Sequence, residues 1–501
     1  MTANPQAADA TMADDFLPDE TSAATVEPRL SPRDRLVIGI LLVSSFVVIL
    51  NETIMSVAIP RLMESLQVSA GAVQWLTTAF LITMAVVIPV TGFLIQRVDT
   101  RSIFIGAMSL FIVGTAICAL SPGLPLLIVG RIVQASGTAI MLPLLMTTAM
   151  TLVPPQMRGR IMGNISIVIS VAPALGPTAS GLILHYLPWQ FLFIVMLPIA
   201  LAAAIYGALR ITNVGEQRYA PLDILSVILS AFGFGGLVYG LSSLGEPAEQ
   251  ATAIPGWAVL VVGLVALAAF ILRQLQLQKT DRAFLDLRTF ASVNFTLAVA
   301  MLAISMGGLF GTVILLPIYL QHVLGIDTLQ TGLMLLPGGL VMGLMAPQVG
   351  RLYDRYGTRP LLIPGTIIVA AVMWALTMVG EDTSIPAILI GHIAISVGLG
   401  LVFTPLFTAS LSSVAPNLYS HGSAIAGVVP QVAGAASVAL FIALMSIREA
   451  ALVADGLPPL AALTGGIRLA FVVGASLSLL SVVLALFVKK PPEQPGGLAH
   501  H

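Results

Sequence analysis

Charge is scarce in this 501-residue chain. Asp, Glu, Lys and Arg make up 9% of the residues, whereas 57% are hydrophobic. Soluble domains carry about 25% charged residues, so this composition excludes a soluble globular protein and predicts one that crosses a membrane many times. Acids and bases nearly balance at a net charge of -1. No overall basic field exists to attract nucleic acid.

Cysteine is almost absent as well. Cys118 is the one cysteine, and it lies within an apolar stretch. A single thiol can form neither a disulfide framework nor a cysteine metal site within one chain. The sequence also lacks a Gly-x-x-x-x-Gly-Lys-Ser/Thr phosphate loop, so ATP is not expected as the energy source. We predict no metal, no cofactor and no enzymatic activity.

The two ends of the chain differ from its apolar body. Residues 1–35 are polar and acid-bearing and lack the basic start and apolar core of a signal peptide. They are predicted to be a disordered cytoplasmic tail. Residues 489–501 are predicted to be a second cytoplasmic tail.

Long apolar runs dominate the remainder. A helix needs about 20 apolar residues to span the hydrocarbon core of a bilayer, and a helix satisfies its own backbone polar groups there. Fourteen runs meet this need, so an all-α membrane protein is predicted. The runs are residues 36–59, 73–95, 103–120, 124–153, 161–184, 191–209, 224–244, 254–272, 293–320, 331–349, 361–379, 385–411, 424–447 and 469–488.

The basic residues predict the orientation. Fourteen crossings put both termini on one side, and 18 of the 22 Lys and Arg residues fall on that side. Only Arg61, Arg448 and Arg468 fall on the other side, and Arg131 lies within the fourth run. Positive charge favours the cytoplasmic side, so both termini are predicted to be cytoplasmic in a multi-pass protein of the inner (cytoplasmic) membrane.

An internal repeat divides the chain. The loops at residues 92–101 and 350–359 share one pattern, and Gly130-Arg131 in the fourth run matches Gly391-His392 in the twelfth. Two six-helix units displaced by eight helices explain both matches. The predicted divisions are a first unit at 36–210, two inserted helices with a basic linker at 211–290, and a second unit at 291–488.

At this point the chain resembles a known family. Two six-helix halves with the loop pattern Gly-x-Leu-x-Asp-Arg-x-Gly-x-Arg resemble the major facilitator superfamily, and the inserted pair is similar to its fourteen-helix drug:proton antiporters. Asn51 and Gln96 resemble the subgroup linked to resistance to lincomycin and related drugs. The resemblance implies proton-coupled drug efflux. Further motifs that carry it lie at residues 50–60, 127–137, 173–181 and 189–193.

Two opposite charges lie inside predicted spans. An acid at the centre of a membrane helix costs roughly 3 kcal/mol, which makes Glu52 a functional candidate. Arg131 lies about 10 Å below the outer end of its helix, at a depth similar to that of Glu52. We expect the two to pair and to take part in proton coupling and substrate binding. The alternative is a static ion pair that fixes helix packing.

Further residues inside the spans, most of them polar, complete the predicted site. His392 occupies the position of Arg131 in the second unit and is a proton-exchange candidate, with a structural histidine as the alternative. Met141 offers adaptable apolar surface to varied ligands. Polar contacts to a substrate in a central cavity are predicted for Gln134, Asn294, Gln321 and Thr404.

Two motifs suggest moving parts. Gly176 and Pro177 can form a hinge or seal in the fifth helix, although ordinary glycine packing explains them equally well. Asp354, Arg355 and Arg359 can form a latch that joins helix ends and breaks on inward opening. Arginines in short cytoplasmic loops are also expected from topology alone. In the first unit Gln96 replaces the acid, so the latch is predicted only in the second.

The function predicted from these features is a proton-coupled multidrug efflux transporter. It would export amphipathic or cationic compounds by alternating access, as a monomer in the lipid bilayer, with protons and small drug-like molecules as its partners. One alternative is an exporter of a single endogenous lipid precursor or metabolite. Another is a membrane sensor or scaffold that does not transport.

Overall fold

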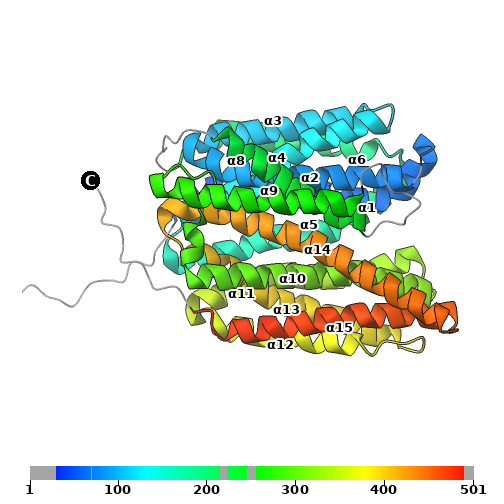
Figure 1. Ribbon diagram of the computed structural model, residues 1–501. Coiled ribbons are helices and arrows are strands. Elements are labelled where there is room, and N and C mark those ends of the chain that lie inside the picture. Colours follow the sequence, from blue (N-terminus) through cyan, green and yellow to red (C-terminus); the bar gives the residue numbers. More distant parts are fainter. Residues whose placement is uncertain (1–29, 69, 215–222, 245–254, 490–501) are drawn as a thin grey trace, which may run out of the picture.

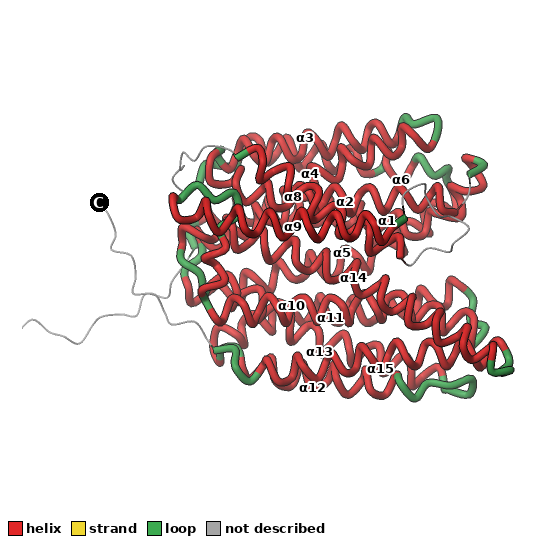
Figure 2. Tube along the Cα trace, viewed as in Figure 1, coloured by secondary structure: helices red, strands yellow, loops and turns green. Residues whose placement is uncertain are grey.

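Helices account for all the regular structure in the part of the chain described by the computed structural model, which comprises residues 30–68, 70–214, 223–244 and 255–489 (Figure 2). The predicted tail at 1–35 therefore lies largely outside the described residues, as does nearly all of 489–501. The all-α membrane fold predicted from composition is confirmed.

The first half of the chain and the inserted pair contain nine α-helices. They are α1 (Pro32–Leu66), α2 (Ala70–Arg97), α3 (Thr100–Ala119), α4 (Leu124–Leu152), α5 (Arg158–Tyr186), α6 (Phe191–Ile194), α7 (Met196–Arg210), α8 (Ile224–Leu244) and α9 (Gly256–Leu277). The short helix η1 (Pro155–Met157) precedes α5, and η3 (Gln278–Thr280) follows α9.

The second half contains six more α-helices. They are α10 (Val293–Ile318), α11 (Thr328–Tyr356), α12 (Arg359–Leu376), α13 (Ile385–Ser412), α14 (Tyr419–Ala454) and α15 (Pro459–Ala485). Short helices lie at η4 (Leu287–Ala291), before α10, and at η6 (Pro416–Leu418), before α14, while η5 (Tyr319–Val323) continues α10 as a π-helix.

Thirteen helical segments in the described part of the chain are long and apolar enough to cross a membrane, with α6 and α7 counted as one. The remaining long helix, α5, has 29 residues and lies among them, so all fourteen predicted runs are helical. Four helices extend seven or more residues beyond the predicted runs: α1 ends at Leu66, α11 at Tyr356 and α14 at Ala454, and α15 begins at Pro459. The first run was expected to end at residue 59, but α1 continues to Leu66 because the exposed Arg61–Glu64 pair stays helical and Gln67, in the left-handed conformation, ends the helix.

Two groups of helices lie side by side (Figure 1). Helices α1 to α7 pack mainly on one another, and α10 to α15 do the same. The groups meet through α5 with α11 and through α14 with α2 and α4. Hydrogen bonds between the groups join Thr147 with Ser423 at 2.6 Å and Thr404 with Ser166 at 2.8 Å. Both bonds lie near the end of the molecule where the described chain begins and finishes.

Glycines allow the closest of these contacts. A methyl group at Gly163 of α5 would overlap the carbonyl oxygen of Ala346 on α11, and one at Gly350 would overlap the carbonyl oxygen of Gly159. Backbones can approach this closely only where the side chain is missing, as is common between membrane helices. The two groups are therefore pressed together at the end that carries the chain termini.

The inserted helices α8 and α9 pack on each other at the periphery, and α8 also contacts α2 and α14. Asp223, before α8, forms an ion pair with Arg273 of α9 at 2.6 Å. The hydrogen bonds from Arg273 and Ser226 lower the pKa of Asp223 from 3.8 to about 2. The linker after α9 is anchored, since Gln274 accepts bonds from the backbone N–H groups of Phe284 and Leu285.

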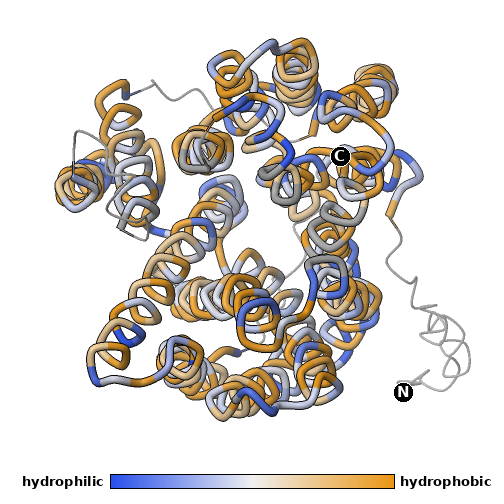
Figure 3. The backbone as a smooth tube through the Cα atoms, turned by 90° about the vertical axis from the view of Figure 1, so that its right-hand side faces the viewer, coloured by the Kyte–Doolittle hydropathy of each residue, from blue (hydrophilic) through white to orange (hydrophobic). Residues whose placement is uncertain are grey.

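Exposed apolar side chains cover the outside of the helices. Figure 3, which looks along the helices, shows orange and white along them and deep blue only in short stretches. Val261, Val262, Leu264 and Val265 of α9 are each at least half exposed. Soluble monomers rarely expose apolar patches of this extent, so this surface is suited to lipid.

Replacing Gly163 by Val should weaken the packing of α5 on α11 at the end that carries the chain termini, which we call the joined end. The added side chain would collide with α11, and overpacking costs about 1–3 kcal/mol. We expect the midpoint of thermal unfolding in detergent to fall by a few degrees. Gly181→Val in the same helix is the matched control, because a side chain there meets nothing within 4 Å. Equal loss in both variants would contradict the packing argument.

The Asp223–Arg273 pair should give a pH-dependent contribution to stability. A folded-state pKa below the ordinary value adds stability that is present above about pH 4 and is lost as the pH falls toward 2. Asp223→Asn should cost up to about 2 kcal/mol at pH 7 and less at pH 3, measured by thermal unfolding. Asp455→Asn, at an exposed carboxylate, is the control.

Candidate functional site

Arg131 is buried among four helices of the first group, with 1% of its surface exposed. Its guanidinium lies over the ring of Phe80 on α2, 4.0 Å from the ring centroid. It donates to Gln134 Oε1 at 2.7 Å, and Gln134 donates in turn to Thr115 of α3 at 2.7 Å. A cation–π contact and a charge-assisted hydrogen bond thus hold a full charge inside the bilayer.

Glu52 of α1 is near Arg131 but does not touch it. The two charges interact electrostatically. Among the described residues, however, no carboxylate lies within 4.0 Å of the Arg131 guanidinium, and Arg131 Nε has no hydrogen-bond partner. The expected proximity is found, whereas a contact ion pair is not. The partly buried Glu52 carboxyl therefore has a positive neighbour and no direct bond to it in the described chain.

The residues on either side of Glu52, Asn51 and Thr53, differ in their contacts. Asn51 is 1% exposed, and its side-chain oxygen has no hydrogen-bond partner in the described part of the chain. Thr53 Oγ1 donates to the carbonyl oxygen of Leu50 at 3.0 Å. A methyl group at Gly176 of α5 would overlap Thr53 Oγ1, so Gly176 permits close packing of α5 on α1. This contact favours the packing interpretation of Gly176. The side chain of Pro177 lies outside the described residues.

His392 of α13 lies in the second group and bonds across to α11. Its Nε2 is 3.0 Å from the carbonyl oxygen of Leu335, and its Nδ1 has no partner among the described residues. Gly338 of α11 leaves room for the ring, since a methyl group there would lie 2.5 Å from His392 Nε2. The ring therefore joins two helices of one group.

The structure does not bring the other predicted site residues together. Gln134 and Met141 are fully buried within the first group. Thr404 is fully buried where the two groups meet. Asn294 lies at the first turn of α10, where it accepts from the Lys489 backbone N–H at 3.0 Å, and Gln321 lies at the opposite end of that helix in η5. Asn294 and Gln321 are thus far from a common centre.

Asp354 joins the two groups. Its carboxylate accepts from the backbone N–H groups of Gly159 at 2.7 Å and Arg160 at 2.8 Å, in the first turn of α5. These N–H groups have no partners within the helix, and the positive end of the helix dipole favours a carboxylate there. Arg355 stacks on Tyr356, and Arg359 donates to the carbonyl oxygen of Val488, so both arginines contact the second group.

Gln96 makes the matching junction in the first group, which the sequence analysis did not predict. Its Nε2 lies 2.8 Å from Ser420 Oγ and 2.8 Å from His421 Nε2, in the first turn of α14. The helix η6 precedes α14 just as η1 precedes α5. The repeat could have revealed this contact, because Gln96 and Asp354 hold the same place in the repeated loop.

Charged residues stand beside this second junction. Asp286 is buried and binds Arg288 through both carboxylate oxygens, and Arg288 also contacts Asp281 at 2.6 Å. The hydrogen bonds that Arg288 donates to Asp286 first, and then to Asp281, raise the pKa of Arg288 above its ordinary value. His421 interacts electrostatically with Asp286 and Arg288. The linker before α10 thus contributes charge next to the Gln96 contact.

Comparisons with known proteins agree with this architecture. The profile described as Major Facilitator Superfamily matches residues 41–438. The chain is 39% identical to the lincomycin resistance protein LmrB of Listeria monocytogenes over 91% of this chain and 96% of that protein. It is 37% identical to LmrB of Bacillus subtilis over 90% and 95%. Among solved structures, the proton:xylose symporter XylE matches with a TM-score of 0.65 and 15% identity, over 92% and 97%.

Removing the Asp354 carboxylate should loosen the joined end. Each hydrogen bond to a charged group contributes about 1.5–3 kcal/mol. Asp354→Ala should therefore raise, by about tenfold or more, the population of an open form in which the two groups have separated at this end. A cysteine at the buried position Thr404 reports this opening. In a Cys118→Ala background, T404C should react with N-ethylmaleimide correspondingly faster when Asp354 is absent.

The control is Asp382→Ala, an exposed carboxylate on the loop after α12. This change should leave the labelling rate unaltered. If Asp354→Ala also leaves it unaltered, the contact does not hold the groups together.

Proposed function

The chain belongs to the Major Facilitator Superfamily, and we propose that it is a proton-coupled exporter of amphipathic or cationic drugs. It is a multi-pass membrane transporter of small molecules and not an enzyme. Relatives named as lincomycin and multidrug resistance proteins support drugs as the cargo. Glu52 supports protons as the coupled ion.

The single observation that carries the proposal is the arrangement of Glu52 and Arg131. Arg131 is fixed by Phe80 and Gln134, yet it forms no contact ion pair within the described chain. The Glu52 carboxyl is thus available to change partners. It can hold a proton, bind a cationic group or move against Arg131, and these three states exclude one another.

Because these states of Glu52 exclude one another, the movement of protons is coupled to the movement of substrate. When Glu52 is charged it attracts a cationic substrate, and when it is protonated that attraction is lost, so proton binding releases the substrate. Proton release on the other side restores the charge. A ligand can shift a conformational equilibrium only by its differential affinity for the two states, and the change in charge at Glu52 supplies that difference.

The proton gradient can drive this exchange. One pH unit across the membrane corresponds to about 1.4 kcal/mol, which supports roughly a tenfold concentration ratio for one-for-one exchange. A substrate bound between the two six-helix groups would meet Glu52 from one side of the membrane and then from the other. His392, Gln134, Met141 and Thr404 are proposed to act with Glu52 and Arg131 in this cycle.

Orientation follows from the basic residues. Most of them lie at the end that carries the chain termini, so we assign that end to the cytoplasm. The two groups, 36–210 and 291–488, are joined there through Asp354 and Gln96, which corresponds to an outward-facing arrangement. Inward opening requires both junctions to break. The inserted pair at 211–290 contacts α2 and α14 and so touches both moving parts.

An exporter of one endogenous metabolite remains a second candidate, since family relationship constrains the machinery more than the cargo. Competition between substrates distinguishes a metabolite exporter from a multidrug exporter. A multidrug exporter should be inhibited by chemically unrelated drugs, whereas a dedicated exporter should be inhibited only by analogues of its own substrate.

Glu52→Gln should abolish proton-driven transport in a protein that still folds. In proteoliposomes with an imposed pH gradient, wild-type protein should accumulate lincomycin or ethidium, and the variant should not rise above passive equilibration. Glu64→Gln is the control, because Glu64 lies on the same helix but is exposed and paired with Arg61. Accumulation by Glu52→Gln at the wild-type rate would falsify the coupling role.

A further inference from the structure

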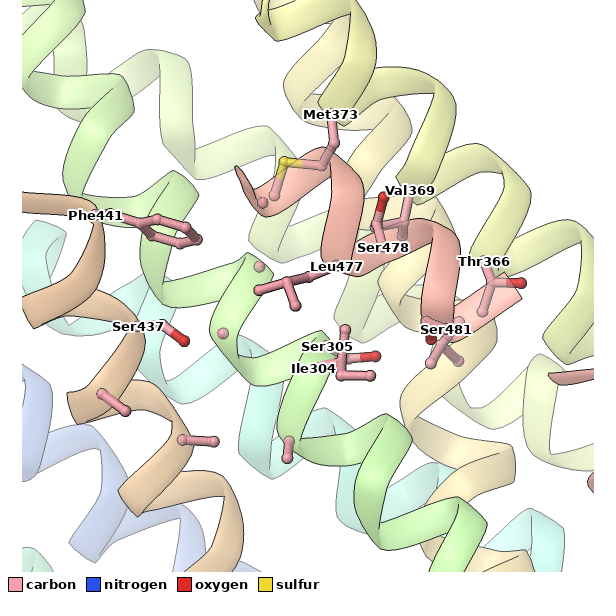
Figure 4. Close-up of a pocket in the computed structure, with 17 residues that line it drawn as sticks. Ile304, Ser305, Thr366, Val369, Met373, Ser437, Phe441, Leu477, Ser478 and Ser481 are labelled. Atoms are coloured by element: carbon pink, nitrogen blue, oxygen red, sulfur yellow. The ribbon is translucent and has the colours of Figure 1, made fainter. Parts of the chain in front are cut away.

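The second group of helices contains a cavity that the exchange mechanism does not use. It has a volume of about 240 Å³ and is lined by residues of α10, α12, α13, α14 and α15. Met373, Val369 and Phe441 form much of its apolar wall, and Figure 4 shows Phe441 and Ser437 pointing from α14 toward α10. The cavity lies within one six-helix group, away from Glu52 and Arg131.

The chemistry of the lining defines what could bind. None of the lining residues is charged, whereas five carry hydroxyl groups: Ser305, Thr366, Ser437, Ser478 and Ser481. An apolar cavity inside a bilayer excludes ions, because an unpaired charge there is costly. A ligand must therefore be uncharged and largely apolar.

Two hydroxyls are open to a ligand. Thr366 and Ser478 donate to carbonyl oxygens of their own helices. Ser481 Oγ has no partner among the described residues, but it has almost no accessible surface, so a molecule in the cavity does not reach it. Ser305 and Ser437 line the cavity and form no hydrogen bond within the described chain, and Ser437 is the less buried of the two. A ligand with a hydroxyl or carbonyl group would give Ser437 a partner.

Glycines create the space. Gly308 of α10 and Gly474 of α15 line the cavity, and a methyl group at Gly308 would meet only the flexible end of Met373, at 3.4 Å. Leu477 also lines the cavity and is 39% exposed on α15, beside the exposed Leu480 and Val483, so entry from the bilayer is placed at this helix as part of the proposal. Drug-sized sites occupy about 300–1,000 Å³, and this cavity is smaller.

We propose that this cavity is a binding site for an uncharged apolar molecule, the size of a medium-length alkanol, that enters from the bilayer and bonds to Ser437 through one hydroxyl group. An apolar protein cavity of about 150 Å³ is known to take up benzene, so the space available here is sufficient for an alkyl chain. The site is separate from the proposed proton-coupled pathway and does not depend on it.

Photolabelling tests the proposal directly. Purified full-length protein in lipid nanodiscs is irradiated with a diazirine-bearing octanol, and the modified residues are located by mass spectrometry. Label should concentrate on Met373, Phe441 and the 473–485 segment of α15, and excess octanol should suppress it. Label spread evenly over lipid-facing residues such as Val261 and Val265, without suppression, would overturn the proposal.

Two variants separate the contributions of space and polarity. Gly308→Val fills the cavity and should reduce labelling at least fivefold, whereas Gly106→Val, at an exposed glycine of α3 with nothing within 4 Å, should not. Ser437→Ala leaves the volume nearly intact and should weaken labelling by the octanol probe by roughly fivefold, the effect of one hydrogen bond. Labelling by a diazirine-octane without the hydroxyl should stay unchanged in Ser437→Ala. Equal loss of both probes would contradict the assigned role of Ser437.

Discussion

Within a bilayer every backbone polar group has to find its partner inside the protein, and this constraint governs the structure. Helices meet this constraint by pairing their internal backbone groups, so that the unpaired N–H groups of the described chain lie at helix ends. Asp354 accepts from two such groups at the start of α5, so a cost inherent to helices becomes the bond that joins the two halves. Gln96 joins the groups at the start of α14 in a different way, because its amide nitrogen donates to the Ser420 hydroxyl instead of accepting from backbone N–H groups. Because these junctions lie at helix ends, near water, they can be broken without exposing backbone to lipid.

Close packing works together with these bonds. Lipid offers no hydrophobic driving force between helices, so their association depends on van der Waals contact. Gly163 and Gly350 bring α5 and α11 into backbone contact at the joined end. The same principle acts at Gly176 against Thr53, within the first group. Small residues therefore serve two purposes, holding the interface between the two groups together and fixing α1 with Glu52 near Arg131.

The fold was largely predictable, and the site was only partly so. The length of each apolar run predicted a helix, because the thickness of the bilayer sets how many apolar residues a crossing needs. Run length could not show that α1 continues past residue 59, because a helix can extend beyond the hydrocarbon core with polar residues. The depth argument brought Glu52 near Arg131. It could not predict that Phe80 and Gln134 would hold the guanidinium, since those contacts depend on rotation about the helix axis. Asn294 and Gln321 lie at opposite ends of one helix, which their polarity alone could not show, because polarity does not give depth.

The absence of a contact ion pair between Glu52 and Arg131 in the described chain has a physical consequence. A tight buried pair would keep both charges satisfied, and any substrate would have to compete with several kcal/mol of existing attraction. An arginine held by a ring and an amide stays positive without the acid. The Glu52 carboxylate then interacts with a nearby positive charge without a direct bond to it. It can bind a proton or a cation without first breaking an ion pair. An exchanger needs this property, and a tight structural ion pair would prevent it.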